Sequence, residues 1–91
     1  MSVHIRRLLV DALKPRETSI VELSQVLCSI EGVEEVDISV SEVDANTETI
    51  KLTIKGPHVR YEDVSKILDE SSVSIKGVDE ISVTKSKPAS K

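Results

Sequence analysis

The stretch VDISVSEVDANTETIKLTIKGP, residues 36–57, decides the fold. Apolar residues occupy every second position on each side of a polar link, first at residues 36, 38 and 40 and then at residues 50, 52 and 54. This alternation is typical of strands with one buried face, because successive side chains of a strand point to opposite sides. The link, residues 44–48, is short enough to join the strands as an antiparallel hairpin, and Gly56-Pro57 ends the second strand.

Further elements are predicted on both sides of this hairpin. Before it, alternation over residues 3–14 indicates a strand that Pro15 ends, and Ser19 with Glu22 forms a capping box that opens a helix reaching toward Gly32. After it, a second helix is predicted over residues 61–71 and a last strand over residues 73–83, with a bulge at Gly77. The tail, residues 85–91, is predicted to be disordered.

The predicted order is β-α-β-β-α-β, an α+β fold of the ferredoxin-like type in a single domain of residues 1–84. Two helices are expected on one face of a four-stranded antiparallel sheet, which leaves the other face open. Leu9, Leu13 and Val43 would give that open face apolar spots. Together with Arg6 and Arg7, they are the candidate residues for contact with another subunit.

Four segments resemble an archaeal family catalogued as domain of unknown function 211. They are RRLLVDALKP (residues 6–15), SIVELSQVL (19–27), EGVEEVDISVSEVD (31–44) and YEDV (61–64). The resemblance covers residues 3–84 and rests on the combination of segments, since no single one is a functional signature. It implies a ferredoxin-like fold and a homo-oligomer. It implies no assigned biochemical activity and no catalytic residues.

Composition excludes several classes of protein. The net charge is −4 and the aromatic residues are a single Tyr with no Phe or Trp, which argues against nucleic-acid binding through a basic face or stacked bases. No apolar run approaches the ~20 residues of a membrane span, and the first fifteen residues hold too short an apolar stretch for a signal peptide. A single cysteine, Cys28, excludes an internal disulfide. We therefore expect a cytoplasmic protein that does not bind membranes.

Acidic residues are concentrated in one part of the chain. Nine acids and no Lys or Arg lie between Glu17 and Ile50. Clustered carboxylates suggest calcium or magnesium, which prefer several oxygen ligands. The candidate ligands are Glu34, Asp37, Glu42 and Asp44. The alternative is a solvated acidic edge that prevents aggregation or pairs with the basic opening segment of another subunit.

The loop before the first predicted helix is a candidate anion site. Lys14 and Arg16 would place positive charge beside free amides at the helix N-terminus, where a phosphate or carboxylate could bind. Against this, Glu17 and Glu22 add negative charge and the loop has no glycine. An ordinary capped helix is the alternative.

No catalytic residues can be named together. His4, His58 and Cys28 are far apart in sequence, and no nucleophile with a base and an orienting group is indicated. We therefore expect a protein that is not an enzyme and has no obligatory cofactor. Two hypotheses remain: a structural, scaffolding or regulatory homo-oligomer, and a ligand-sensing module that binds a small anion or a divalent cation between subunits.

Overall fold

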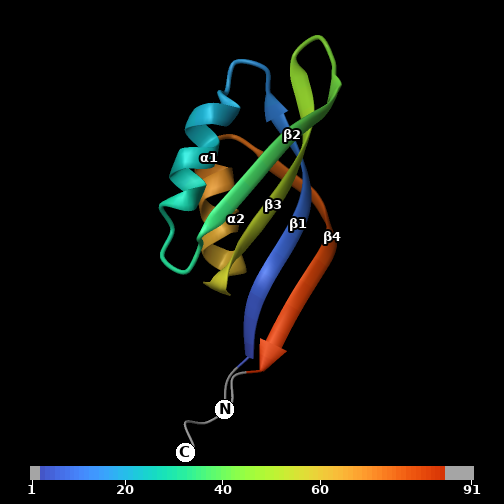
Figure 1. The fold of residues 1–91 in the computed structure, drawn as a ribbon. Coiled ribbons are helices and arrows are strands. Elements are labelled where there is room, and N and C mark those ends of the chain that lie inside the picture. Colours follow the sequence, from blue (N-terminus) through green and yellow to red (C-terminus); the bar gives the residue numbers. More distant parts are fainter. Residues whose placement is uncertain (1–2, 86–91) are drawn as a thin grey trace, which may run out of the picture.

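Four strands and two helices follow one another in the predicted order (Figure 1). The computed structural model describes residues 3–85. The elements are β1 (Val3–Pro15), α1 (Ile20–Cys28), β2 (Glu35–Val43), β3 (Thr47–Val59), α2 (Tyr61–Glu70) and β4 (Ser74–Lys85).

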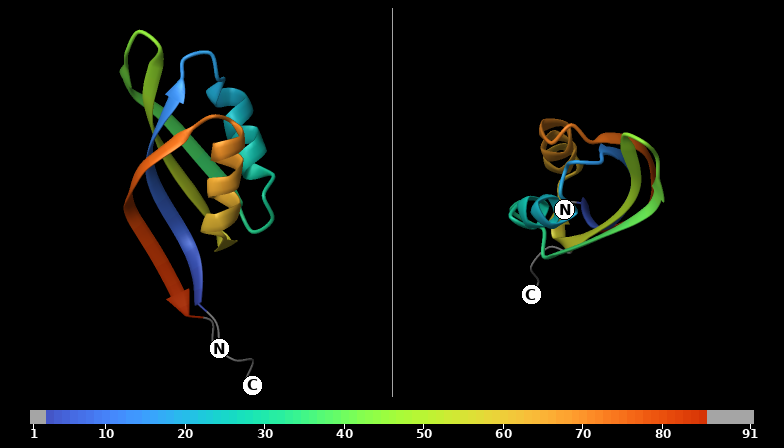
Figure 2. Two further views of the ribbon diagram at one scale, coloured as in Figure 1. Left: turned by 180° about the vertical axis from the view of Figure 1, so that it is seen from behind. Right: turned by 90° about the horizontal axis from the view of Figure 1, so that it is seen from above.

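The strands form one antiparallel sheet with the order β2-β3-β1-β4. Both helices lie side by side on the concave side of this curved sheet, and the convex side is bare (Figure 2). The ferredoxin-like α+β fold is therefore confirmed, and β2 and β4 are its two edge strands.

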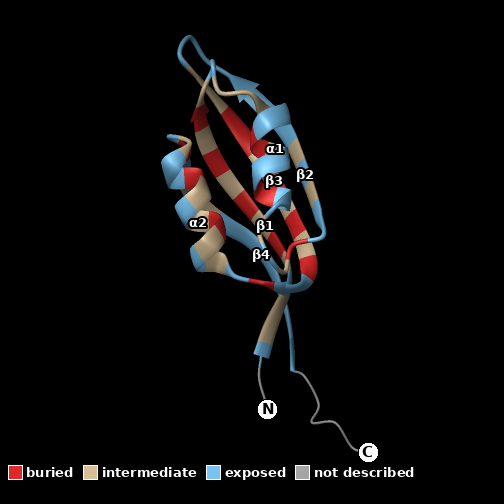
Figure 3. Ribbon diagram, turned by 90° about the vertical axis from the view of Figure 1, so that its left-hand side faces the viewer, coloured by how far each residue is buried: buried red, intermediate tan, exposed pale blue. Residues whose placement is uncertain are grey.

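The core lies between the sheet and the helices. Register places Leu8 opposite Ile54 and Ala12 opposite Ile50, so the apolar positions of the two central strands meet on one face. Figure 3 shows the resulting alternation of buried and less buried positions along these strands. The fully buried strand residues are Leu8, Val10, Ala12, Ile50, Leu52 and Ile54, and the helices cover them with Leu23, Leu27, Val64 and Leu68. With so few aromatic residues, branched aliphatic side chains make this core.

The first helix is shorter than predicted. Its N-cap is Ser19, whose side chain accepts hydrogen bonds from the amides of Val21 and Glu22, as expected. The helix ends at Cys28, so Gly32 lies in the loop beyond it, with φ +93°. A Cβ on Gly32 would lie 2.1 Å from the carbonyl oxygen of His58. Gly32 therefore lets the loop pack directly on β3 and does not end the helix.

Bulges in the edge strands β4 and β2 change which side chains share a face. The pairing of β1 with β4 shifts register on both sides of Gly77, so the predicted bulge there is confirmed. A second shift, between Val40 and Glu42 of β2, was not predicted. It places Val43 opposite Glu48, on the face that the helices cover. The prediction that Val43 shares the open face with Leu9 and Leu13 is therefore wrong.

The ends of the chain are only partly described. β4 continues to Lys85, and the remainder of the predicted tail, residues 86–91, lies outside the described residues. Within residues 3–85, neither helix has the length and hydrophobicity needed to cross a bilayer.

The contact of the α1–β2 loop with β3 makes a test of the fold. A Cβ on Gly56 would lie 2.0 Å from the carbonyl oxygen of Gly32. Because that oxygen belongs to the backbone, it cannot move aside without shifting the α1–β2 loop. We expect Gly56→Ala to lower the free energy of unfolding by more than about 2 kcal/mol in chemical denaturation. Gly77→Ala is the matched control, because open space surrounds that position; it should change stability by less than about 1 kcal/mol. Equal effects of the two substitutions would contradict the packing described here.

Candidate functional site

The open face of the sheet carries cross-strand ion pairs. Two of these pairs, Asp11 with Lys51 and Glu35 with Lys55, join residues directly opposite each other on neighbouring strands. Arg7 and Glu80 lie diagonally across β1 and β4, and Lys51 reaches Asp79 across β1. The pairs are Arg7 with Glu80, Lys51 with Asp79 (3.0 Å), Lys51 with Asp11 (3.5 Å) and Lys55 with Glu35 (3.9 Å). The hydrogen bond to Asp79 and the nearby charge of Asp11 raise the pKa of Lys51 above its usual value.

The predicted interface residues on β1 lie among these ion pairs. Arg7 is engaged by Glu80 of its own chain, while Arg6 is exposed where the register of β1 shifts. Leu9 and Leu13 are half-buried among charged and hydroxylic neighbours. The open face is therefore polar and internally neutralised, and its two leucines do not form a continuous apolar patch.

The predicted metal ligands do not converge. Asp37 and Glu42 lie on β2, while Glu34 comes just before the strand and Asp44 just after it. The first and last of them are ten residues apart, which is roughly 30 Å along an extended strand. Within residues 3–85, no three His, Cys, Asp or Glu side chains are grouped so that they could hold a metal ion. These four candidate ligands therefore do not form one site within a single chain.

Lys14 is buried instead of facing an anion. Its side chain is only 2% exposed and forms an ion pair with Glu48 of β3. Its ammonium also donates to the carbonyl oxygens of Pro15 (3.0 Å) and Arg16 (3.4 Å), so all three of its N–H groups have acceptors. The Arg16 side chain, by contrast, is exposed in the loop. Lys14 and Arg16 therefore do not form the predicted anion site.

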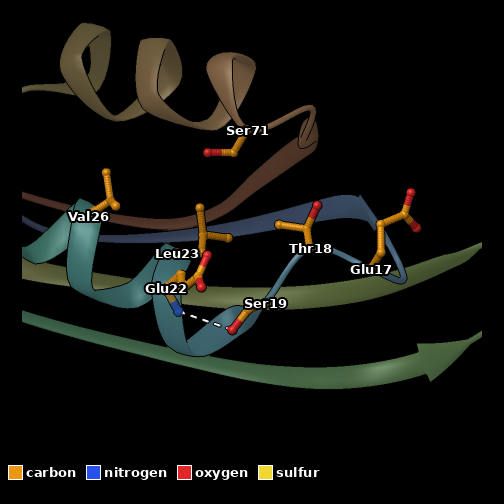
Figure 4. Close-up of a pocket in the computed structure, with 7 residues that line it drawn as sticks. All are labelled: Glu17, Thr18, Ser19, Glu22, Leu23, Val26 and Ser71. Carbon is orange, nitrogen blue, oxygen red and sulfur yellow. Dashed lines mark hydrogen bonds between the residues drawn. The ribbon is translucent and has the colours of Figure 1, made fainter.

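A cavity of about 280 Å³ lies beside the N-terminus of α1 (Figure 4). It is lined by Glu17, Thr18, Ser19, Glu22, Leu23, Val26 and Ser71. Ser71, which follows α2, faces the α1 side of the cavity, and the hydroxyl of Ser19 is already used as the helix cap. Two carboxylates and no cationic side chain line the space, which disfavours an anion there.

The more informative surface lies at the edges of the sheet. Eight large hydrophobic residues are exposed among the described residues. Five of them belong to the two edge strands: Val40, Val43, Val78, Ile81 and Val83. Of these five, the sequence predicted a buried face for Val40 alone. The lengths of the elements indicate this exposure. Strands β1, β3 and β4 have 12 or 13 residues and are longer than the helices of 9 and 10 residues, which therefore cannot cover the ends of the strands.

Comparison with known proteins gives two matches. Residues 6–87 match the family model DUF211, described as uncharacterized ArCR. An uncharacterized protein of Methanocaldococcus jannaschii, MJ0319, is 34% identical over 77 residues, which cover 85% of this chain and 79% of that protein. The resemblance noted in the sequence is therefore confirmed over nearly the whole domain.

The buried pair of Lys14 and Glu48 makes a second test. Glu48→Gln would leave a buried ammonium without its counter-charge, so we expect unfolding free energy to fall by about 3 kcal/mol. Lys55→Met, which removes the exposed pair with Glu35, should cost less than about 1 kcal/mol. The double variant Lys14→Met with Glu48→Leu should recover most of the loss, since it removes both charges. Equal losses for Glu48→Gln and Lys55→Met in urea denaturation would refute the assignment.

Proposed function

The chain belongs to the DUF211 family of uncharacterized proteins, and on that premise we propose that it is a non-catalytic assembly module whose copies join through edge strands β2 and β4. The observation that carries the proposal is the concentration of exposed hydrophobic residues on these two strands. Assembly of this kind suits a structural, scaffolding or regulatory role in the cytoplasm.

The apolar residues lie where a neighbouring strand would cover them. Val78, Ile81 and Val83 face Val10, Leu8 and Ile5 of β1, so they share the face of the sheet on which the helices pack. Even so, Ile81 is 54% and Val83 is 47% exposed. The reason is visible in Figure 1, where β4 runs past the end of α2. Burial of such side chains against another copy is favourable by roughly 25 cal/mol per Å² of apolar area removed from water.

The outer side of each edge strand offers backbone groups for the same contact. β2 and β4 each have one neighbouring strand in the sheet, so their other sides carry N–H and C=O groups that do not take part in the ladder. A second copy can satisfy those groups by continuing the sheet. Hydrogen bonding and apolar burial would then favour the same arrangement.

Charge favours contact between unlike edges. β2 carries no Lys or Arg, and its Asp37 and Glu42 lie outside the ion pairs of the described residues, so two β2 edges would repel one another. On β4, the acids Asp79 and Glu80 are paired with Lys51 and Arg7 of their own chain. That leaves Lys76 and Lys85 as the cationic residues of β4 outside the ion pairs of the described residues.

An acidic β2 edge therefore complements the β4 edge of the next copy. Such a contact joins two different surfaces, so repeating it leads to a closed ring or to a filament. The number of copies depends on the angle between neighbours, which a single chain does not determine.

The alternative is a module that senses a small anion or a divalent cation, calcium or magnesium, held between subunits. Its support is weaker. The predicted carboxylates are spread along β2, and Lys14 is engaged within the chain. A cavity of about 470 Å³ combines Arg6, Arg7 and Lys55 with Glu34 and Glu35, which leaves it without a strong preference for either sign of charge.

Native mass spectrometry tests the assembly directly. We expect a mass that is a multiple of the 10.0 kDa chain, and a fall to 10.0 kDa for Ile81→Lys, because a charged side chain would enter the apolar contact. Val21→Lys is the matched control, since Val21 is 63% exposed on α1 and far from either edge strand in sequence. A monomeric unmodified protein, or an Ile81→Lys assembly of unchanged mass, would contradict the proposal. EDTA should leave the mass unaltered; dissociation by EDTA would favour the cation-sensing alternative.

A mixing experiment tests the pairing of unlike edges. Val43→Lys blocks β2 and Ile81→Lys blocks β4, so each variant alone should be monomeric. In a mixture, the intact β2 of one variant can still bind the intact β4 of the other, and we expect a heterodimer of about 20 kDa, twice the 10.0 kDa chain. If β4 instead pairs with β4, Val43→Lys alone would remain a dimer and mixing would change nothing.

A further inference from the structure

Two histidines far apart in sequence converge at one end of the sheet. His4 lies on β1 and His58 lies near the end of β3, 54 residues later. Their Nδ1 atoms are in hydrogen-bond contact, and the ring centroids are 4.4 Å apart with the planes at 66°. The two Nδ1 atoms therefore lie next to each other. We propose that His4 and His58 bind a divalent late transition-metal ion, with Zn²⁺ as the reference case, through these two atoms.

The backbone holds His58 in place for this role. The pairing of β1 with β3 jumps from Ile5–Val59 to Arg7–Lys55, so residues 56–58 of β3 bulge out beside Arg6. Bulges redirect side chains, and here the bulge turns His58 toward His4. The α1–β2 loop supports the bulge from the other side, because the His58 amide donates to the carbonyl oxygen of Gly32 (3.3 Å). A ligand held by a fixed backbone loses little entropy when the metal binds.

The donor set selects the class of ion. Imidazole nitrogen suits zinc, copper, nickel and iron, whereas calcium and magnesium prefer several oxygen ligands. In the metal-free pair, one Nδ1 donates a hydrogen to the other. When an ion binds, the two rings must move apart so that both Nδ1 lone pairs can reach it, and each ring then carries its proton on Nε2. Binding between neutral rings then needs this movement and a change of tautomer, with no net release of protons.

Open space borders the histidine pair on the side of His58. A cavity of about 400 Å³ is lined by His58 together with Glu31, Gly32, Arg60 and Asp63. Asp63 is held by Arg60 (3.6 Å), and within residues 3–85 no third His, Cys, Asp or Glu completes a metal cluster with the two rings. An ion held by the two imidazoles would take water at its remaining positions. With fewer protein ligands than structural zinc sites, which have four, or catalytic ones, which have three, we expect the bound ion to be exchangeable.

Titration calorimetry of the whole protein with ZnCl₂ in a non-chelating buffer tests the proposal. We expect one Zn²⁺ per chain, and a dissociation constant at least roughly tenfold higher for His58→Gln and for His4→Gln, since each removes half of the protein's ligands. Circular dichroism shows whether the variants fold. CaCl₂ and MgCl₂ should give no saturable binding at the same concentrations. Unchanged zinc affinity in His58→Gln would overturn the site.

Two controls separate this site from other sources of binding. Cys28→Ser tests the single thiol, which donates to the carbonyl oxygen of Glu34 in the present structure (3.6 Å). Loss of zinc binding in Cys28→Ser, or in His4→Gln but not in His58→Gln, would also overturn the proposal. Ile81→Lys should bind zinc like the unmodified protein, because both histidines belong to one chain. The metal site and the proposed assembly can therefore fail independently.

Discussion

The structure depends on a mismatch of lengths between its sheet and its helices. The central strands β1 and β3 have 13 residues each, about 43 Å when extended, while the helices of 9 and 10 residues are only about 15 Å long. Two short helices can cover only the middle of so long a sheet. The core forms there, and apolar side chains on the same face remain exposed toward the ends. The elongated shape, 57 × 22 × 17 Å, is the outcome.

Much of the fold could be predicted because its signals are local. Alternation along β1 and β3 required only that successive side chains of a strand point to opposite sides, and burying one face then places Leu8 and Ile54 on the same side of the sheet. The N-cap at Ser19 could also be predicted, because its hydroxyl accepts hydrogen bonds from amides only two and three residues away, which does not depend on tertiary contacts. The bulge at Gly77 interrupted an otherwise regular pattern.

The candidate sites were harder to predict because they depend on which residues of distant strands meet. The single extra residue at the β2 bulge moves Val43 to the opposite face, and no turn signal marks that bulge. In the sequence, Lys14 looks like an exposed cation. In the structure, the register of β1 with β3 places it opposite Glu48, with which it forms a buried ion pair. Nothing in the sequence links His4 with His58. They come into contact because residues 56–58 bulge out of the pairing between β1 and β3. Each case needed knowledge of a pairing that sequence spacing does not encode.

The place of β1 between β3 and β4 also bears on how the chain folds. β1 is the first strand along the chain, yet its pairing with β4 joins residues as distant as Val3 and Lys85. Loop-closure entropy must be overcome before such contacts become favourable, so a large share of long-range pairing slows folding. During synthesis, β1 can pair with β3 while its other side waits for the last strand to leave the ribosome. Until β4 pairs with it, β1, a central strand of the finished sheet, has one side without a neighbouring strand, as an edge strand does.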